Sequence, residues 1–152
     1  MRFVGKYGFW LLIGMLSLVS CRQDYQSNVP DYPVNLDIDI EREYPHFVPS
    51  APCQSLVFDH KRYERDYIGY AGVVVWININ GEYRAADLCC PKCLNRTKPI
   101  QMHGKDDMFP ECPICGEVFD LTLEGFPTKG IADQPLKRYD VSYSGRVLHI
   151  RH

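Results

Sequence analysis

Two short cysteine turns limit what this chain can fold into more than any other feature. Residues 90–93 read Cys-Pro-Lys-Cys, residues 112–115 read Cys-Pro-Ile-Cys, and eighteen residues separate the two turns. A Cys-x-x-Cys turn directs two sulfur atoms to one side of a tight loop, and two facing turns supply four thiolates at tetrahedral spacing. The pattern therefore predicts one metal centre with four ligands, namely Cys90, Cys93, Cys112 and Cys115.

The same four cysteines leave several kinds of site open. Four thiolates serve zinc and iron–sulfur centres alike, so the pattern indicates a metal without choosing it. Disulfides are a further alternative in an exported chain. A bridge inside one turn would be strained and easily reduced, whereas bridges crossed between the turns would be less strained. Thiol–disulfide exchange is disfavoured because no helix is predicted after either turn.

The start of the chain predicts export and attachment to a lipid. A positively charged beginning precedes the apolar residues 9–19, a length typical of a signal-peptide core and short for a membrane span. Residues 18–21 read Leu-Val-Ser-Cys, which resembles the lipobox of bacterial lipoproteins. We therefore expect a signal peptide over residues 1–20 and lipidation of Cys21. The expected location is the bacterial cell envelope, on the periplasmic side of the inner or outer membrane.

The remaining residues are predicted to form one domain on a tether. Residues 21–33 are polar and contain two prolines, which suits a link between a membrane and a domain. Residues 34–152 have the length of a single domain. The formal net charge is −2 and no basic cluster is present, so nucleic acid is not an expected partner. The expected partners are the membrane, through the lipid, and an unidentified envelope component.

Short alternating segments predict an all-β domain. Apolar and polar residues alternate without error over residues 34–41, as in a half-buried strand. Residues 72–79 are rich in β-branched and aromatic side chains, and Asn-Gly at 80–81 predicts a hairpin turn. The returning strand would lead into the first cysteine turn. A second hairpin is predicted over residues 136–150, and no segment after the signal shows twelve residues of helical periodicity.

From the first hairpin onward, the order of the elements resembles the Rieske family. A hairpin enters a Cys-Pro turn, and the second turn reads CPICGEVFDL. A loop rich in glycine and proline then leads to a terminal hairpin with the pattern Leu-x-x-Tyr-x-Val. The likeness runs from about Gly69 to Ile150 and is densest over residues 111–141. It implies stacked antiparallel sheets with a small two-loop metal-binding subdomain at about residues 88–120.

The resemblance also implies a [2Fe–2S] cluster. In the family, each turn gives one cysteine to one iron and one histidine to the other iron. Cys90 and Cys112 match the two cysteine positions. Cys115 occupies the second histidine position, whereas Lys92 stands at the first and Cys93 lies one residue further on. The expected ligand set is therefore all cysteine, which implies a reduction potential near the ferredoxin range of about −400 mV.

The leading expectation is a membrane-anchored, Rieske-like iron–sulfur protein that carries single electrons in the cell envelope. The alternative is a non-redox lipoprotein binding module with structural zinc, or disulfides, in place of the cluster. No general acid, general base or substrate pocket can be named, so a complete catalyst is not expected. Lys92 and Ile114, at the tips of the turns, would lie close to the site. Cys53 and Cys89 have no assigned role, and a bridge between them stays open.

Overall fold

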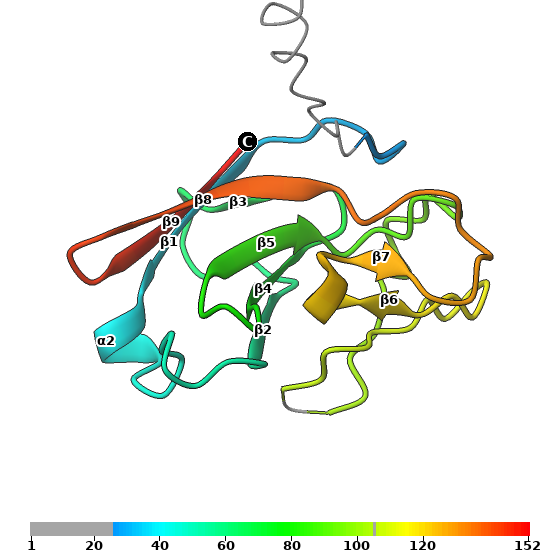
Figure 1. Ribbon diagram of the computed structural model, residues 1–152. Helices are drawn as coiled ribbons and strands as arrows, with labels where there is room; N and C mark the ends of the chain where they lie inside the picture. Colours follow the sequence, from blue (N-terminus) through cyan, green and yellow to red (C-terminus); the bar gives the residue numbers. More distant parts are fainter. Residues whose placement is uncertain (1–25, 105) are drawn as a thin grey trace, which may run out of the picture.

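Short strands form almost all of the regular structure in the computed structural model, which describes residues 26–104 and 106–152 (Figure 1). One antiparallel sheet has the order β2-β4-β5-β8-β9-β1-β3, with β1 (Val34–Asp39), β2 (Ser55–Phe58), β3 (Tyr67–Ile68), β4 (Val73–Ile77), β5 (Tyr83–Asp87), β8 (Arg138–Ser144) and β9 (Val147–Arg151). A second small sheet pairs β6 (Phe119–Asp120) with β7 (Phe126–Pro127). The all-β prediction is confirmed. The predicted signal peptide and Cys21 lie outside the described residues.

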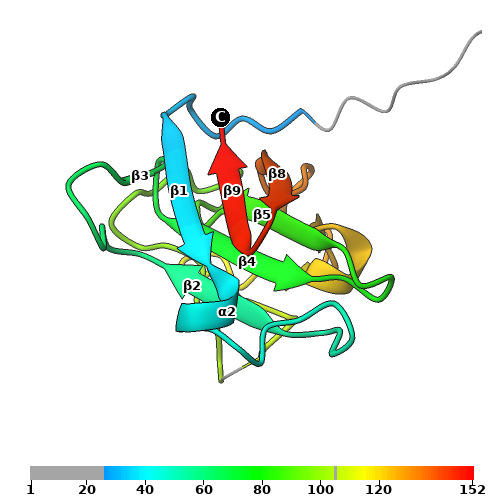
Figure 2. The same cartoon turned by 90° about the vertical axis from the view of Figure 1, so that its left-hand side faces the viewer.

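The large sheet folds into two layers because β8 pairs with a different neighbour at each end. Arg138 and Tyr139 pair with β5, whereas residues 140–144 pair with β9. Figure 2 shows β1 and β9 crossing over β4 and β2. The two layers therefore face each other, in agreement with the predicted stacked antiparallel sheets.

The core between the layers follows from the alternating pattern of β1. Val34, Leu36 and Ile38 are buried, and the residues between them are only half-buried. A period of two places these three side chains on one face of the strand, as the sequence predicted. The same buried cluster includes side chains of β4 and β9, namely Val73, Val75, Ile77, Leu148 and Ile150.

The strand β4 is buried on both of its faces and joins two cores. Its other face contributes Val74 and Trp76 to a second cluster, which also contains Cys90, Cys112 and Leu136. The end of the molecule that carries the cysteine turns therefore rests on a core of its own. β4 and its neighbour β5 both contribute to the two cores, since Ala85 lies in the core between the layers and Ala86 in the second core.

The first strand ends earlier than its alternating pattern. The pattern reaches residue 41, but β1 stops at Asp39 and the short helix α2 (Ile40–Glu43) follows. The Asp39 carboxylate accepts a hydrogen bond from the backbone N–H of Arg42 at 3.2 Å, which caps the helix. The predicted hairpins around residues 80–81 and 144–145 are both present.

The described part of the predicted tether, residues 26–33, lies against the domain. The side chain of Val29 is only 3% exposed, and the N–H of Gly69 donates to the carbonyl of Pro33 at 3.2 Å. The position of the domain boundary stays a prediction. No helix among residues 26–104 and 106–152 has the length and hydrophobicity that a membrane crossing requires.

Candidate metal centre

Each cysteine turn is closed by a backbone hydrogen bond and a left-handed residue. The N–H of Leu94 donates to the carbonyl of Cys90, and the N–H of Gly116 donates to the carbonyl of Cys112, both at 2.9 Å. Gly116 has a φ of 71° and Leu94 a φ of 47°. Glycine adopts this conformation without a steric penalty, so the residue after the second turn suits its position.

The two turns bring four sulfur atoms together. Cys90 Sγ lies 3.8 Å from Cys115 Sγ, and Cys93 Sγ lies 3.8 Å from Cys112 Sγ. All four sulfur atoms lie within 4.8 Å of one another. The four residues are free cysteines, and the 3.8 Å separations far exceed a disulfide bond of about 2.05 Å. The predicted ligand set is therefore assembled, and its role as a set of ligands stays a prediction.

The sulfur spacing fits one tetrahedral ion. A metal–sulfur bond of about 2.3 Å in a regular tetrahedron places neighbouring sulfur atoms about 3.8 Å apart. In a two-iron cluster, the width of the Fe₂S₂ core separates the ligands of one iron from those of the other. The family arrangement would separate Cys90 and Cys112 from the ligands of the other iron, whereas all four sulfur atoms here lie within 4.8 Å of one another. Both histidine positions are also filled by other residues, so the Rieske cluster does not fit this site.

The ligand atoms lie at the boundary between the core and the surface. Cys90 and Cys112 are buried, whereas Cys93 and Cys115 are half-buried. Burial raises the pKa of Cys90 to about 11 and also raises the pKa of Cys93. Burial opposes ionisation of Cys115 as well, but hydrogen bonds from the Glu117 N–H and the neighbouring thiols lower its pKa overall. A cation placed among the four sulfur atoms would offset the cost of burying thiolates.

A buried carboxylate braces the second turn, and the sequence analysis missed it. Glu117 is fully buried and follows the turn directly. Its Oε1 accepts N–H groups from Val118, Thr128 and Lys129, and its Oε2 accepts those of Ile131 and Ala132, over distances of 2.5–3.1 Å. Burial opposes ionisation, but these backbone donors hold the pKa of the carboxyl below its usual value. Glu117 thus fixes the loop over residues 128–132 beside the turn.

A second buried carboxylate braces the first turn. Asp87 ends β5, and its side chain accepts hydrogen bonds from the N–H of Cys89 at 2.7 Å and the hydroxyl of Tyr139 at 2.6 Å. It also accepts from the N–H of Tyr70 at 2.7 Å. Burial raises the pKa of this carboxyl despite those donors. Each cysteine turn therefore has an acidic residue that orients the backbone next to it.

Two residues that were predicted near the site lie at the turn tips. The ammonium of Lys92 is exposed and donates to the carbonyl of Ile131 at 2.9 Å, and the side chain of Ile114 is 45% exposed. The two unassigned cysteines are not bridged. Cys53 is exposed, whereas Cys89 is buried, and burial raises the pKa of the Cys89 thiol to about 12.

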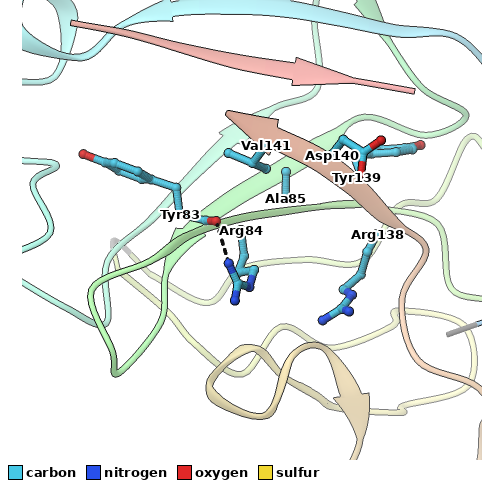
Figure 3. Close-up of a pocket in the computed structure, with 7 residues that line it drawn as sticks. All are labelled: Tyr83, Arg84, Ala85, Arg138, Tyr139, Asp140 and Val141. Carbon is cyan, nitrogen blue, oxygen red and sulfur yellow. Dashed lines mark hydrogen bonds between the residues drawn. The ribbon is translucent and has the colours of Figure 1, made fainter. Parts of the chain in front are cut away.

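A pocket lies between β5 and β8, where the strands diverge. It has a volume of about 380 Å³, and Figure 3 shows Arg84 and Arg138 pointing to one side of it. Glu124 forms an ion pair with each guanidinium group, at 3.1 Å from Arg84 Nε and 2.5 Å from the Nη1 of Arg138. No cysteine, serine or histidine lines this pocket, so it offers no nucleophile of these types. The cysteine cluster is the candidate site that carries chemistry.

Comparison with solved structures finds distant likenesses. No protein-family model matches the chain, and no curated protein matches it. The chain is similar to a chain in the complex of reduced oxygenase and oxidized ferredoxin in carbazole 1,9a-dioxygenase, with 17% identity and a TM-score of 0.43 over 68% of this chain and 95% of that one. It is also similar to the Sphingomonas yanoikuyae B1 ferredoxin, with 16% identity and a TM-score of 0.42 over 81% of this chain and 99% of that one. Likenesses this distant do not decide the function.

Proposed function

We propose that this chain is a lipid-anchored metal–thiolate protein of the bacterial cell envelope that carries single electrons on an iron centre. The ligands would be the thiolates of Cys90, Cys93, Cys112 and Cys115. The observation that supports this proposal most strongly is the gathering of four sulfur atoms within 4.8 Å from two separate turns. Thiolates favour iron and zinc over harder cations such as magnesium and calcium.

The coordination favours a carrier over a catalyst. Four thiolates fill a tetrahedral site, so no position is left open for a substrate or a water molecule. The half-buried sulfur atoms of Cys93 and Cys115 bring the centre close to the surface, where a partner can approach. The likeness of the second turn and its following loop to the Rieske family supports a redox role for such a centre.

The spacing of the sulfur atoms favours a single iron over the [2Fe–2S] cluster that the family resemblance implies. Closest contacts of 3.8 Å match the edge of a tetrahedron around one ion. A cluster would require the two turns to move apart so that each pair of thiolates could bind its own iron. Iron bound by four thiolates can gain and lose one electron without a change of ligands, which is the property that a carrier needs.

A second candidate is a non-redox binding module in which the same sulfur atoms hold structural zinc. The closed, four-coordinate geometry is the arrangement typical of structural zinc sites. Export as an unfolded lipoprotein also favours zinc, because a zinc ion is easier to acquire outside the cytosol than an iron–sulfur cluster. In this case the metal would only stabilise the turn-bearing end of the domain.

Metal analysis of the mature protein, purified from its native envelope, separates these functions. Iron, zinc and acid-labile sulfide are measured per chain, together with the visible spectrum. One iron without sulfide supports the proposed carrier, and two irons with two sulfides would support a carrier that binds the cluster instead. One zinc and a colourless protein support the binding module. Metal-free protein without free thiols would overturn both.

A further inference from the structure

The segment that precedes β1 is fastened to the domain by a buried ammonium group. Lys137 is only 8% exposed, and its Nζ donates to the carbonyl of Val29 at 3.3 Å and forms an ion pair with Asp31. One residue before Val29, the N–H of Asn28 donates to Oε1 of Gln134 at 2.7 Å. These contacts fix the place where the chain enters the domain.

That place is next to the first cysteine turn. Asn28 lines a pocket of about 260 Å³ together with Pro91, Lys92 and Leu94 of the turn. Further along the segment, the ring of Tyr32 meets the edge of Tyr70 at a centroid distance of 5.2 Å, and the Tyr70 hydroxyl lies 3.4 Å from the carbonyl of Leu94. The chain between the predicted lipid and the domain therefore leaves the molecule at its metal-binding end.

The length of that chain limits how far the metal centre can move from the lipid. Seven residue steps separate Cys21 from Asn28. A fully extended chain covers at most about 3.5 Å per residue, so these steps span at most about 25 Å. A lipid on Cys21 would hold Asn28 within that distance of the bilayer surface, and the first cysteine turn lies across one pocket from Asn28.

The surface around the first turn has the charge that an anionic bilayer attracts. Residues 88–104 contain three exposed cations, Lys92, Arg96 and Lys98, and no carboxylate. One exposed carboxylate, that of Asp133, lines the same pocket as Lys92, so the cations are in excess. Two apolar side chains, Leu94 and Ile114, are 39% and 45% exposed at the turn tips. Cations with exposed apolar residues between them are typical of surfaces that rest on anionic headgroups.

We propose that the metal-binding end of this domain rests on the anionic surface of the membrane that holds its lipid. The inference depends on the proposed lipid anchor and adds an orientation to it. The attachment of residues 28–32 directs the turns toward the bilayer, and the three cations contact the headgroups. The metal centre would then exchange electrons in the plane of the membrane surface.

Hydrogen exchange of the lipidated, metal-loaded protein tests this orientation. The protein is placed in nanodiscs of phosphatidylglycerol and, for comparison, in nanodiscs of phosphatidylcholine. We expect amides of residues 88–98 and 111–116 to exchange several-fold more slowly on the anionic discs. Equal exchange of these segments on the two lipids would overturn the inference.

Matched variants identify the contacts responsible. Lys98→Gln should reduce the protection on anionic discs, whereas Arg146→Gln removes one charge from the β8–β9 turn at the opposite end of the molecule (Figure 1) and should leave it unchanged. Lys137→Met should loosen the attached segment and also reduce the protection. Equal effects of Lys98→Gln and Arg146→Gln would contradict a specific contact surface.

Two further measurements keep this test separate from the proposed function. The mass of the N-terminal peptide reports the lipid on Cys21, and elemental analysis reports the metal. If the lipid is missing, the proposed anchor and the orientation fail together. If lipid and metal are both present and no protection is seen, the orientation alone fails.

Discussion

Cys112 and Cys53 form the clearest pair for testing which cysteines bind the metal. Cys112 is fully buried among the four sulfur atoms, whereas Cys53 is exposed and lies outside the cluster. Cys112→Ser should abolish stoichiometric metal binding and destabilise the end of the domain that carries the cysteine turns, because structural zinc sites contribute apparent binding energies of about 10 kcal/mol or more. Cys53→Ser should retain the metal. Elemental analysis and thermal unfolding check both, and equal metal loss would show that the ligand set is wrong.

Glu117 links the second cysteine turn to the loop over residues 128–132, because its carboxylate accepts hydrogen bonds from the backbone of that loop. Glu117→Gln would replace one acceptor oxygen with an amide group that faces backbone donors, at a cost of about 1–3 kcal/mol. We expect lower stability in urea and faster metal loss to a chelator, with the metal stoichiometry unchanged. Glu111→Gln is a suitable control, because the side chain of Glu111 is 38% exposed. A Glu117→Gln protein as stable as the control would contradict this positioning role.

The two faces of β4 allow the two cores to be perturbed separately. Val75 packs into the core between the layers, and Val74 packs into the core beneath the cysteine turns. Truncation of either to alanine removes two buried methyl groups, and each should lower the free energy of unfolding by about 2 kcal/mol. Only Val74→Ala should also accelerate metal release. Chemical denaturation and chelator kinetics measure the two effects, and equal release rates would show that the cores are not separable.

Local sequence patterns predicted the individual strands and turns better than they predicted which strands pair with one another. The hairpins at residues 80–81 and 144–145 could be predicted because turn residues and strand residues are adjacent in sequence. The division of β8 between β5 and β9 could not, because it depends on contacts between distant segments. The same limit applied to β1, which ends at Asp39 because that side chain caps a helix that periodicity alone does not reveal.

In the candidate site too, the features set by local sequence could be predicted and those set by distant contacts could not. Cysteine spacing and the prolines in the turns predicted that the sulfur atoms would meet, since each turn sets its own geometry. The roles of Asp87 and Glu117 could not be predicted, because charged residues are rarely buried. Four of the five N–H groups that donate to Glu117 also come from residues more than ten positions away in sequence. A glutamate directly after a Cys-Pro-x-Cys-Gly turn is the signal that could have drawn attention to it.

Removal of the metal should affect one end of the molecule more than the other. The core between the layers contains none of the four cysteines. The second core contains Cys90 and Cys112, and Cys93 and Cys115 pack against it. We expect the chelated protein to keep its β-sheet circular dichroism and to lose ordered side-chain signals near the turns. Nuclear magnetic resonance spectra with and without chelator would check this. Complete unfolding on chelation would instead show that the whole fold depends on the metal.

Trp76 would report optically on a metal bound by the four cysteines, once the predicted signal peptide is removed. The chain has two tryptophans, Trp10 in the predicted signal peptide and Trp76 in the core that also contains Cys90 and Cys112. The indole of Trp76 is buried, and its Nε1 has no hydrogen-bond partner among the described residues. Iron–thiolate absorption would quench its emission by energy transfer, whereas zinc is colourless and would leave it bright. In the purified protein, the fluorescence of this one side chain would therefore distinguish the two metals.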